Sequence, residues 1–294
     1  MTGAGPCFTG AARTALRLGT RLVPRGRPGV TVLAYHLVGA GTSSPVDLPV
    51  EAFRRQMEEL REGGSEVAPL SRAVAALEAG APLERDLVAI TFDDAYRNFD
   101  EVAYPVMEAL RLPATLFVPT DFVDGARPGP LRGAEELPPV PWGRLRELAD
   151  GGLVELGSHS RSHPDLRAVP EGTLEDEVAG SKAVLRERTG AEPSVFCYPR
   201  ALRSPCVEAA VARSYRGAVV GGGRKSLPGR TSPLRIQRVS LRRDMPARLG
   251  PLLAASVVLE EWAAERLRGR RSVGRTVENR PVDRMHTRRD DDAP

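Results

Sequence analysis

Short apolar runs alternate with amphipathic stretches along most of the chain, and this alternation constrains the fold more than any other feature of the sequence. The apolar runs predict strands over residues 30–36, 87–92, 114–118, 153–156, 194–198, 217–220 and 235–241. The other stretches predict helices over residues 50–63, 71–79, 104–112, 142–150, 171–189, 205–214 and 246–268. Six or seven β/α alternations of this kind favour parallel strands covered by helices.

The alternation leaves a choice between a closed barrel and a doubly wound sheet. No Gly-rich dinucleotide or phosphate loop follows the first predicted strand, and this favours the barrel. A chain of 294 residues can form such an α/β barrel as a single domain. We therefore predict one catalytic domain over residues 30–268, with a Gly- and Pro-rich surface loop over residues 124–141.

The net charge of +4 is unevenly distributed along the chain. Residues 1–29 hold five Arg and no acidic residue, residues 266–294 hold nine Arg and five acidic residues, and residues 30–265 carry a net charge of −5. An acidic centre without clustered aromatic residues argues against a nucleic-acid partner. The basic N-terminal segment and the C-terminal end are compatible with peripheral contact to an anionic membrane surface. Residues 269–294 have almost no apolar side chains and predict a disordered tail.

Targeting and cysteine signals are weak. No run of about 18 apolar residues predicts a transmembrane helix, and Arg interrupts residues 1–29 too often for a secretory signal, so we expect a cytoplasmic protein. Three widely spaced cysteines, Cys7, Cys197 and Cys206, predict neither a disulfide framework nor a CxxC metal site.

Two adjacent carboxylates, Asp93 and Asp94, directly follow the uncharged strand predicted at residues 87–92. Buried carboxylates are costly unless a partner compensates them, and sites form at the carboxyl ends of parallel strands. One carboxylate of such a pair can bind a cation while its neighbour faces the substrate. The alternative is that an aspartate caps the next helix.

Two of the four histidines, His159 and His163, follow the strand predicted at residues 153–156. Their i, i+4 spacing would place both rings on one face of a helical turn, where they can chelate one metal ion. A histidine-capped helix start is the alternative. Together with an aspartate, they predict a divalent metal site with open positions, which suits Zn, Co, Ni, Mn or Fe. The second aspartate can act as a base on water, so the expected chemistry is hydrolysis.

Three short segments, TFDD at residues 91–94, HSRSH at residues 159–163 and FCYPR at residues 196–200, resemble the first three motifs of the polysaccharide deacetylases. This is carbohydrate esterase family 4, the NodB-homology family. LAYHLVG, PATLFVPTDFV and ELGSHSRSHPDL extend the resemblance over roughly residues 30–242. The resemblance implies a distorted (β/α)7-type barrel, one divalent metal ion, and removal of acetyl groups from N-acetylated sugars in glycans.

The resemblance also implies roles for individual residues. It assigns Asp93 as the general base and Asp94, His159 and His163 as metal ligands, with Zn the expected metal and Co, Ni or Mn the alternatives. Ser160 would brace the loop that carries the histidines.

The third motif departs from the family pattern. The resemblance implies that the amide of Arg200 helps to hold the oxyanion and that Tyr198 and Pro199 belong to the same oxyanion and substrate wall. Cys197 stands where the family often has the Arg that tunes the base, and Ala201 stands where a Gly is common.

The late histidine that usually protonates the leaving amine has no counterpart in residues 234–243, and His286 lies in the predicted tail. His36, at the end of the first predicted strand, is the hypothesised general acid, and a structural histidine is the alternative.

The sequence therefore predicts a metal-dependent carbohydrate deacetylase that acts on an acetylated glycan or amino sugar. The alternatives are a hydrolase of other linear or cyclic amides on the same barrel and a catalytically weak glycan-binding protein. The sequence leaves the oligomeric state open.

Overall fold

Seven parallel strands close into a barrel in the computed structural model, which describes residues 27–245, 247–250 and 253. Each strand pairs in parallel with the next around the ring, and β1 closes it by pairing with both β5 and β10. In sequence order the strands are β1 (Val30–Tyr35), β5 (Leu87–Phe92), β6 (Ala114–Val118), β7 (Val154–Ser158), β8 (Val195–Cys197), β9 (Gly217–Gly221) and β10 (Ile236–Ser240). The predicted (β/α)7-type barrel is therefore confirmed, and the doubly wound alternative is wrong because the sheet closes.

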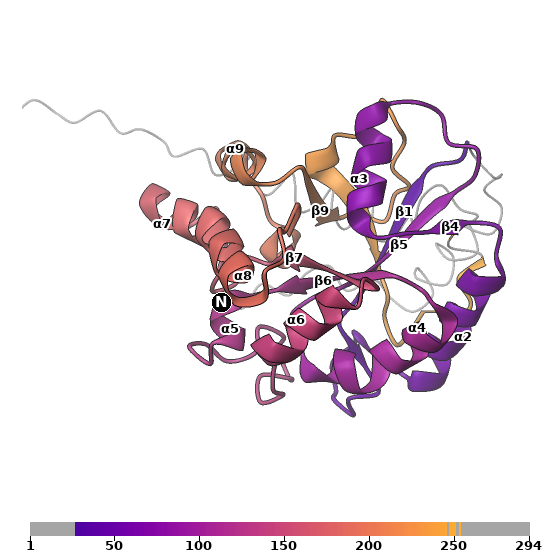
Figure 1. Ribbon diagram of the computed structural model, residues 1–294, viewed down its shortest axis with the longest axis horizontal. Helices are drawn as coiled ribbons and strands as arrows, with labels where there is room; N and C mark the ends of the chain where they lie inside the picture. Colours follow the sequence, from indigo (N-terminus) through magenta and orange to yellow (C-terminus); the bar gives the residue numbers. More distant parts are fainter. Residues whose placement is uncertain (1–26, 246, 251–252, 254–294) are drawn as a thin grey trace, which may run out of the picture.

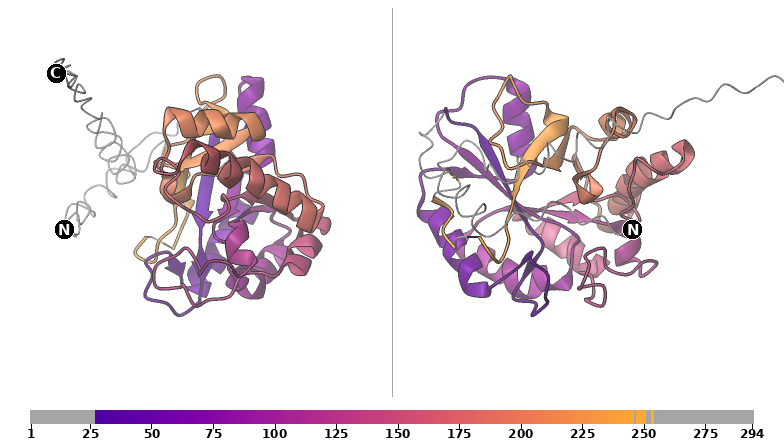
Figure 2. Two further views of the ribbon diagram at one scale, coloured as in Figure 1. Left: turned by 90° about the vertical axis from the view of Figure 1, so that its left-hand side faces the viewer. Right: turned by 180° about the vertical axis from the view of Figure 1, so that it is seen from behind.

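Helices lie around the outside of this barrel (Figure 1). The α-helices are α2 (Val50–Glu62), α3 (Leu70–Ala79), α4 (Tyr104–Leu110), α5 (Thr120–Val123), α6 (Trp142–Asp150), α7 (Glu171–Glu175), α8 (Ser181–Thr189) and α9 (Pro205–Ser214). There are also π-helices, η1 (Phe99–Ala103) and η2 (Asp176–Gly180), and short 3₁₀ turns, η3 (Pro199–Ala201) and η4 (Pro233–Arg235). The run from α7 through η2 to α8 lies beside α9 on one flank (Figure 2, left).

Three short strands lie outside the ring. β4 (Glu66–Val67) adds to the edge of β5, and β2 (Leu37–Val38) pairs with β3 (Asp47–Leu48) in a separate ribbon. The ribbon directly follows β1, so it shapes the end of the barrel at which β1 stops.

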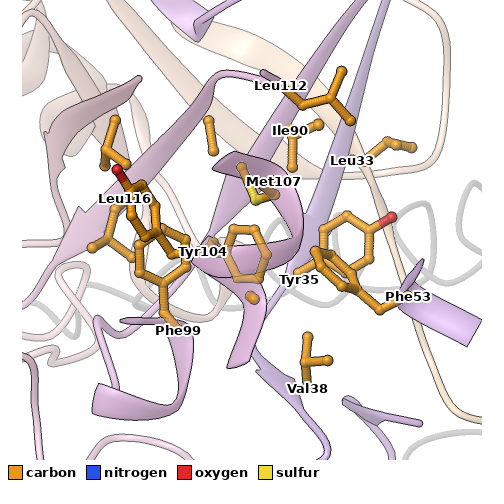
Figure 3. Packing of buried hydrophobic residues seen from close by; sticks show 14 of the residues in the cluster. Leu33, Tyr35, Val38, Phe53, Ile90, Phe99, Tyr104, Met107, Leu112 and Leu116 are labelled. Atoms are coloured by element: carbon orange, nitrogen blue, oxygen red, sulfur yellow. The ribbon is translucent and has the colours of Figure 1, made fainter. Parts of the chain in front are cut away.

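Alternate residues of each strand face the barrel interior and the surrounding helices, as the two-residue period of a strand requires. In β5, for example, Val88, Ile90 and Phe92 pack in the outer cluster with residues of α2 and α4, whereas Leu87 and Ala89 pack in a separate inner cluster. Figure 3 shows part of the outer cluster, with Ile90 among the labelled residues. Both faces of the strands are buried, which explains why the strands appear in the sequence as nearly continuous apolar runs.

The predicted elements largely agree with the structure. The strands at residues 87–92 and 114–118 and the helices at residues 142–150 and 205–214 have the predicted bounds. The helix predicted over residues 171–189 is interrupted by the π-helix η2. Some predictions fall on residues that the structure does not describe. These are residues 1–26 of the predicted basic segment, most of the helix predicted over residues 246–268, and all of the predicted tail. None of the described helices has the length and apolarity needed to cross a membrane.

Candidate metal centre and active site

The candidate site lies at the carboxyl ends of the barrel strands, where a parallel arrangement collects side chains from distant parts of the sequence. His36 directly follows β1, Asp93 and Asp94 follow β5, and His159 directly follows β7. The structure thus brings together side chains that are separated by up to 123 residues in the chain.

Asp94, His159 and His163 form a compact group of candidate metal ligands. Their ligand atoms all lie within 4.8 Å of one another. The Asp94 Oδ1 atom is 3.6 Å from His159 Nε2 and 4.0 Å from His163 Nε2, and the two imidazole rings are 4.5 Å apart. One carboxylate and two imidazoles are a donor set that suits a divalent transition metal.

The protonation of this group also fits a cation. His159 Nδ1 lies 2.8 Å from the backbone oxygen of Cys197, which can only accept, so Nδ1 carries the proton and Nε2 presents its lone pair towards Asp94. Burial lowers the pKa of His159 to about 4 and also lowers the pKa of His163, so both rings are neutral at pH 7.

Within the described part of the chain, the buried carboxylate of Asp94 lacks a partner that would compensate its charge, and a bound cation would provide one. Its Oδ1 atom is buried and has no hydrogen-bond partner among the described residues. Burial, and then the neighbouring charge of Asp93, raise the pKa of Asp94 well above its usual range. A divalent cation between Asp94 and the two imidazoles would compensate this carboxylate.

The histidines reach this position on an irregular loop, so the prediction of a helical turn is wrong. Ser160 and His163 have φ angles of 63° and 55°, in the left-handed region that non-glycine residues seldom adopt. The hydroxyl of Ser158 accepts from the amide of Ser160 at 3.2 Å, and the hydroxyl of Ser160 accepts from the amide of His163 at 3.1 Å. These local side-chain acceptors compete with helical hydrogen bonding and fix the loop instead.

Asp93 is held by a buried arginine, Arg238, from the middle of β10. Two hydrogen bonds join them, Nη1 to Oδ1 at 2.6 Å and Nη2 to Oδ2 at 2.7 Å, in the bidentate geometry of strong arginine–carboxylate pairs. Burial alone would raise the pKa of Asp93, but the charge and hydrogen bonds of Arg238 hold it well below its usual range. Asp93 is therefore ionised at neutral pH even though it is only 4% exposed.

Cys197 completes the surroundings of this pair. Its Sγ atom lies 3.1 Å from Nη2 of Arg238 and 3.8 Å from both carboxylate oxygens of Asp93. Burial raises the pKa of the thiol well above its usual range, so the thiol is protonated. Asp93, His159 and Cys197 also have ligand atoms within 4.8 Å of one another. Because Arg238 already occupies both oxygens of Asp93, the group built on Asp94 is the better cation site.

His36 also lies beside Asp93. Its Nε2 atom is 3.6 Å from Oδ2 of Asp93, its side chain is 18% exposed, and its buried Nδ1 has no partner among the described residues. Burial lowers the pKa of His36, with the charge of Asp93 opposing that effect. The following ribbon is anchored by Asn98, whose amide side chain bonds both backbone groups of Val38 at 2.8 and 2.9 Å.

The third motif forms a tight turn after β8. Arg200 and Ala201 both have φ of 56°, and the turn closes with Ala201 N–H donating to the oxygen of Tyr198 at 2.9 Å. The Arg200 side chain is exposed, whereas Pro199 is buried. The Tyr198 ring is also buried, packed against Phe196 at 5.5 Å in the cluster beneath α9. Of these residues, Arg200 is therefore the one whose side chain faces solvent.

A comparison with protein families gives one match, over the middle of the chain. The family model for polysaccharide deacetylase matches residues 80–215, the segment that contains the two aspartates, both histidines and the third motif. Residues 80–215 thus match the polysaccharide deacetylase family.

One curated relative and two solved structures are similar to the chain, and the solved structures share its fold. The chain is 29% identical over 153 residues to the poly-β-1,6-N-acetyl-D-glucosamine N-deacetylase of Escherichia coli K12, a match that covers 50% of this chain and 23% of that protein. The chain thus spans about a quarter of that relative's length. The deacetylase PplD of Streptococcus pyogenes, solved with acetate, has a TM-score of 0.68 at 18% identity over 79% of this chain and 99% of its own. IcaB of Ammonifex degensii has a TM-score of 0.63 at 23% identity, over 82% and 98%.

Two of the residues around Asp93 lie outside the segment matched by the polysaccharide deacetylase model, namely His36 and Arg238. His36 was predicted from the sequence, whereas Arg238 was not, because the resemblance implied an arginine at the position of Cys197. The available signal was the place of Arg238 in the strand predicted over residues 235–241, two residues after Ile236, which faces the barrel interior. The two-residue period of a strand then directs Arg238 inward as well.

Proposed function

We propose that this chain is a metal-dependent hydrolase that removes acetyl groups, principally N-acetyl groups, from a glycan or amino sugar. The observation that carries the proposal is the pairing of two adjacent aspartates with opposite surroundings. Asp94 faces two neutral imidazoles, whereas Asp93 is kept ionised by Arg238. The match to the polysaccharide deacetylase family model and the name of the E. coli relative support an N-acetylated sugar as the substrate.

Asp94, His159 and His163 would hold the metal ion, and zinc is the metal that we propose. When bound, a divalent cation would polarise the acetyl carbonyl and lower the pKa of water. With two neutral ligands and one carboxylate, the site would keep a net positive charge for the oxyanion that develops during hydrolysis.

Asp93 would act as the general base. Arg238 fixes the orientation of the carboxylate and keeps it ionised, and each carboxylate oxygen retains a second lone pair for the attacking water. The low pKa that Arg238 imposes makes Asp93 a weak base, so we expect the proton to leave Asp93 quickly once it has been accepted.

His36 would carry that proton to the leaving nitrogen. Because burial lowers its pKa, His36 is neutral at rest and must first receive a proton. We propose that this proton comes from Oδ2 of Asp93, which lies 3.6 Å from Nε2 of His36. The backbone N–H of Arg200 would contribute to holding the oxyanion, in a role that does not depend on the arginine side chain.

We further propose that residues 30–268 form the catalytic unit and that the Arg-rich ends contribute attachment rather than chemistry. A variant without residues 1–26 and 269–294 should keep its turnover. Sedimentation of both forms with anionic vesicles tests the attachment separately from the chemistry.

The direct test of the proposed function is acetate release from N-acetylglucosamine oligomers and from O-acetylated xylan, measured with added zinc or cobalt and with a chelator. We expect metal-dependent release from the N-acetylated substrate. A protein with one metal ion bound that releases acetate from neither substrate would overturn the proposal.

A further inference from the structure

The loop between the two metal-binding histidines is fastened by one buried carboxylate that the proposed chemistry does not use. Oε2 of Glu177 accepts hydrogen bonds from the amides of Arg161 and Ser162, both at 2.9 Å. Oε1 of Glu177 accepts from the hydroxyl of Ser162 at 2.5 Å. Glu177 is only 6% exposed, so these bonds form largely away from water.

The carbonyl groups of the loop are satisfied from a different direction. The amide of Thr120 donates to the oxygen of Ser160 at 3.3 Å, and the amide of Asp121 donates to the oxygen of Arg161 at 2.9 Å. The loop is therefore held between the start of α5 on one side and Glu177 on the other.

The amide groups of the loop depend on Glu177 more than on any other residue. Ser160 donates to the hydroxyl of Ser158, and His163 donates to the hydroxyl of Ser160. The amides of residues 161 and 162 have Glu177 as their acceptor. Removing that carboxylate would leave two partly buried donors unpaired, in a loop that already contains two non-glycine residues with positive φ.

The helix that supplies Glu177 is locally widened at this point. Glu177 is the second residue of the π-helix η2, and Glu175 and Asp176 just before it are exposed. π-Helical turns frequently occur at functional sites. At Gly180, the last residue of η2, an added Cβ atom would lie 3.5 Å from Cδ of Arg161, at ordinary packing distance, so the loop lies directly against this helix.

Glu177 has no basic side-chain partner among the described residues. Its three hydrogen bonds all come from residues 161 and 162 of the loop. A buried carboxylate is costly, and here its compensation comes from the segment that carries the metal-binding histidines. We propose that Glu177 is a positioning residue that presets His159 and His163 to receive the cation. The inference rests on the proposed function for the identity of that cation, whereas its structural part concerns the loop alone.

The test compares Glu177→Ala and Glu177→Gln with the wild type and with the control Glu175→Gln. Glu175 precedes Glu177 by two residues but is exposed and paired with Arg213. Two quantities are measured, the amide hydrogen exchange of residues 158–164 in metal-free protein and the dissociation constant for zinc from competition with a chromogenic chelator.

We expect Glu177→Ala to accelerate exchange in the loop and to weaken zinc binding about 10- to 100-fold, the range typical of lost outer-shell partners. The Gln side chain keeps an acceptor oxygen, so Glu177→Gln should recover most of that loss. Turnover at saturating zinc should stay within roughly threefold of wild type in both variants, because the proton-transfer groups are untouched. Glu175→Gln should leave both measured quantities unchanged.

Wild-type exchange and wild-type zinc affinity in Glu177→Ala would overturn the inference. If Glu177→Ala does not fold, Ser162→Ala, which removes the hydroxyl that donates to Oε1 of Glu177, decides instead. Faster loop exchange in Ser162→Ala would support the inference, and unchanged exchange would refute it. If the wild type binds no metal, the proposed function fails, and the exchange measurement still decides whether Glu177 holds the loop.

Discussion

The two sides of the candidate site are built by different means. On the base side, Asp93 and Arg238 project from barrel strands or their ends into the interior and hold each other through two short hydrogen bonds. On the ligand side, His159 and His163 follow β7 on an irregular loop whose shape depends on side-chain hydrogen bonds. The strand ladder fixes the base side, whereas a chain of local contacts fixes the ligand side. Remote substitutions should therefore disturb metal binding more readily than proton transfer.

The largest effect expected on the ligand side comes from Asp94→Asn. The variant loses the charged member of the ligand group, so zinc affinity should fall by more than the 10- to 100-fold that an outer-shell change produces. Turnover should fall with it, because the cation would activate the water. Metal content after dialysis and acetate release give the two readouts, and stoichiometric zinc in this variant would contradict the ligand assignment.

Arg238→Gln removes the guanidinium that holds Asp93 on the base side of the site. Removing one partner of a buried pair typically costs about 3–5 kcal/mol, so metal-free protein should lose about that much unfolding free energy at pH 7. The pKa of Asp93 is depressed in the folded protein, so the stabilisation by the pair is complete above about pH 4 and is lost as the pH falls further. Denaturant unfolding at pH 7 and pH 3 should show a gap between variant and wild type that narrows in acid. A difference in unfolding free energy that is the same at both pH values would mean that the lost stability does not come from the ionised Asp93–Arg238 pair.

His36→Gln separates proton delivery from metal binding. Removing a general acid typically costs 10²- to 10⁴-fold in rate, so kcat should fall at least about a hundredfold while zinc affinity stays at the wild-type value. Steady-state kinetics with a zinc titration measure both quantities. Turnover near the wild-type value would leave His36 with a structural role only.

The smallest effect is expected from Ser160→Ala. It removes the hydroxyl that accepts from the amide of His163, a contact of about 1 kcal/mol. Zinc affinity should weaken roughly fivefold with kcat at saturating zinc unchanged. If kcat changed and zinc affinity did not, the separation between the two sides of the site would be wrong.

The difference between the two sides also explains what the sequence could predict. The strands were predictable because both faces are buried, which leaves continuous apolar runs such as residues 87–92. The positions of Asp93 and Asp94 at a strand end follow from the same pattern. Closure of the sheet was favoured by the sequence but could be established only from the pairing of β1 with β5.

The remaining features depend on contacts between distant segments. The loop of His159 and His163 was expected as a helical turn from its spacing alone, because the competing hydroxyls of Ser158 and Ser160 act through geometry that spacing does not encode. Arg238 lies 145 residues from Asp93, so its role appears only when β10 closes against β1. Glu177 is one of several acidic residues in the run from α7 to α8, and its burial distinguishes it from the exposed Glu175 and Asp176.

The central claim is that Asp93 moves the proton and Asp94 holds the cation. Asp93→Asn tests it most directly, with zinc content and acetate release measured on the same preparation. We predict one tightly bound zinc ion per chain, at wild-type affinity, and acetate release reduced by about a thousandfold or more. Loss of both zinc and turnover, or turnover close to the wild-type rate, would contradict this division of roles.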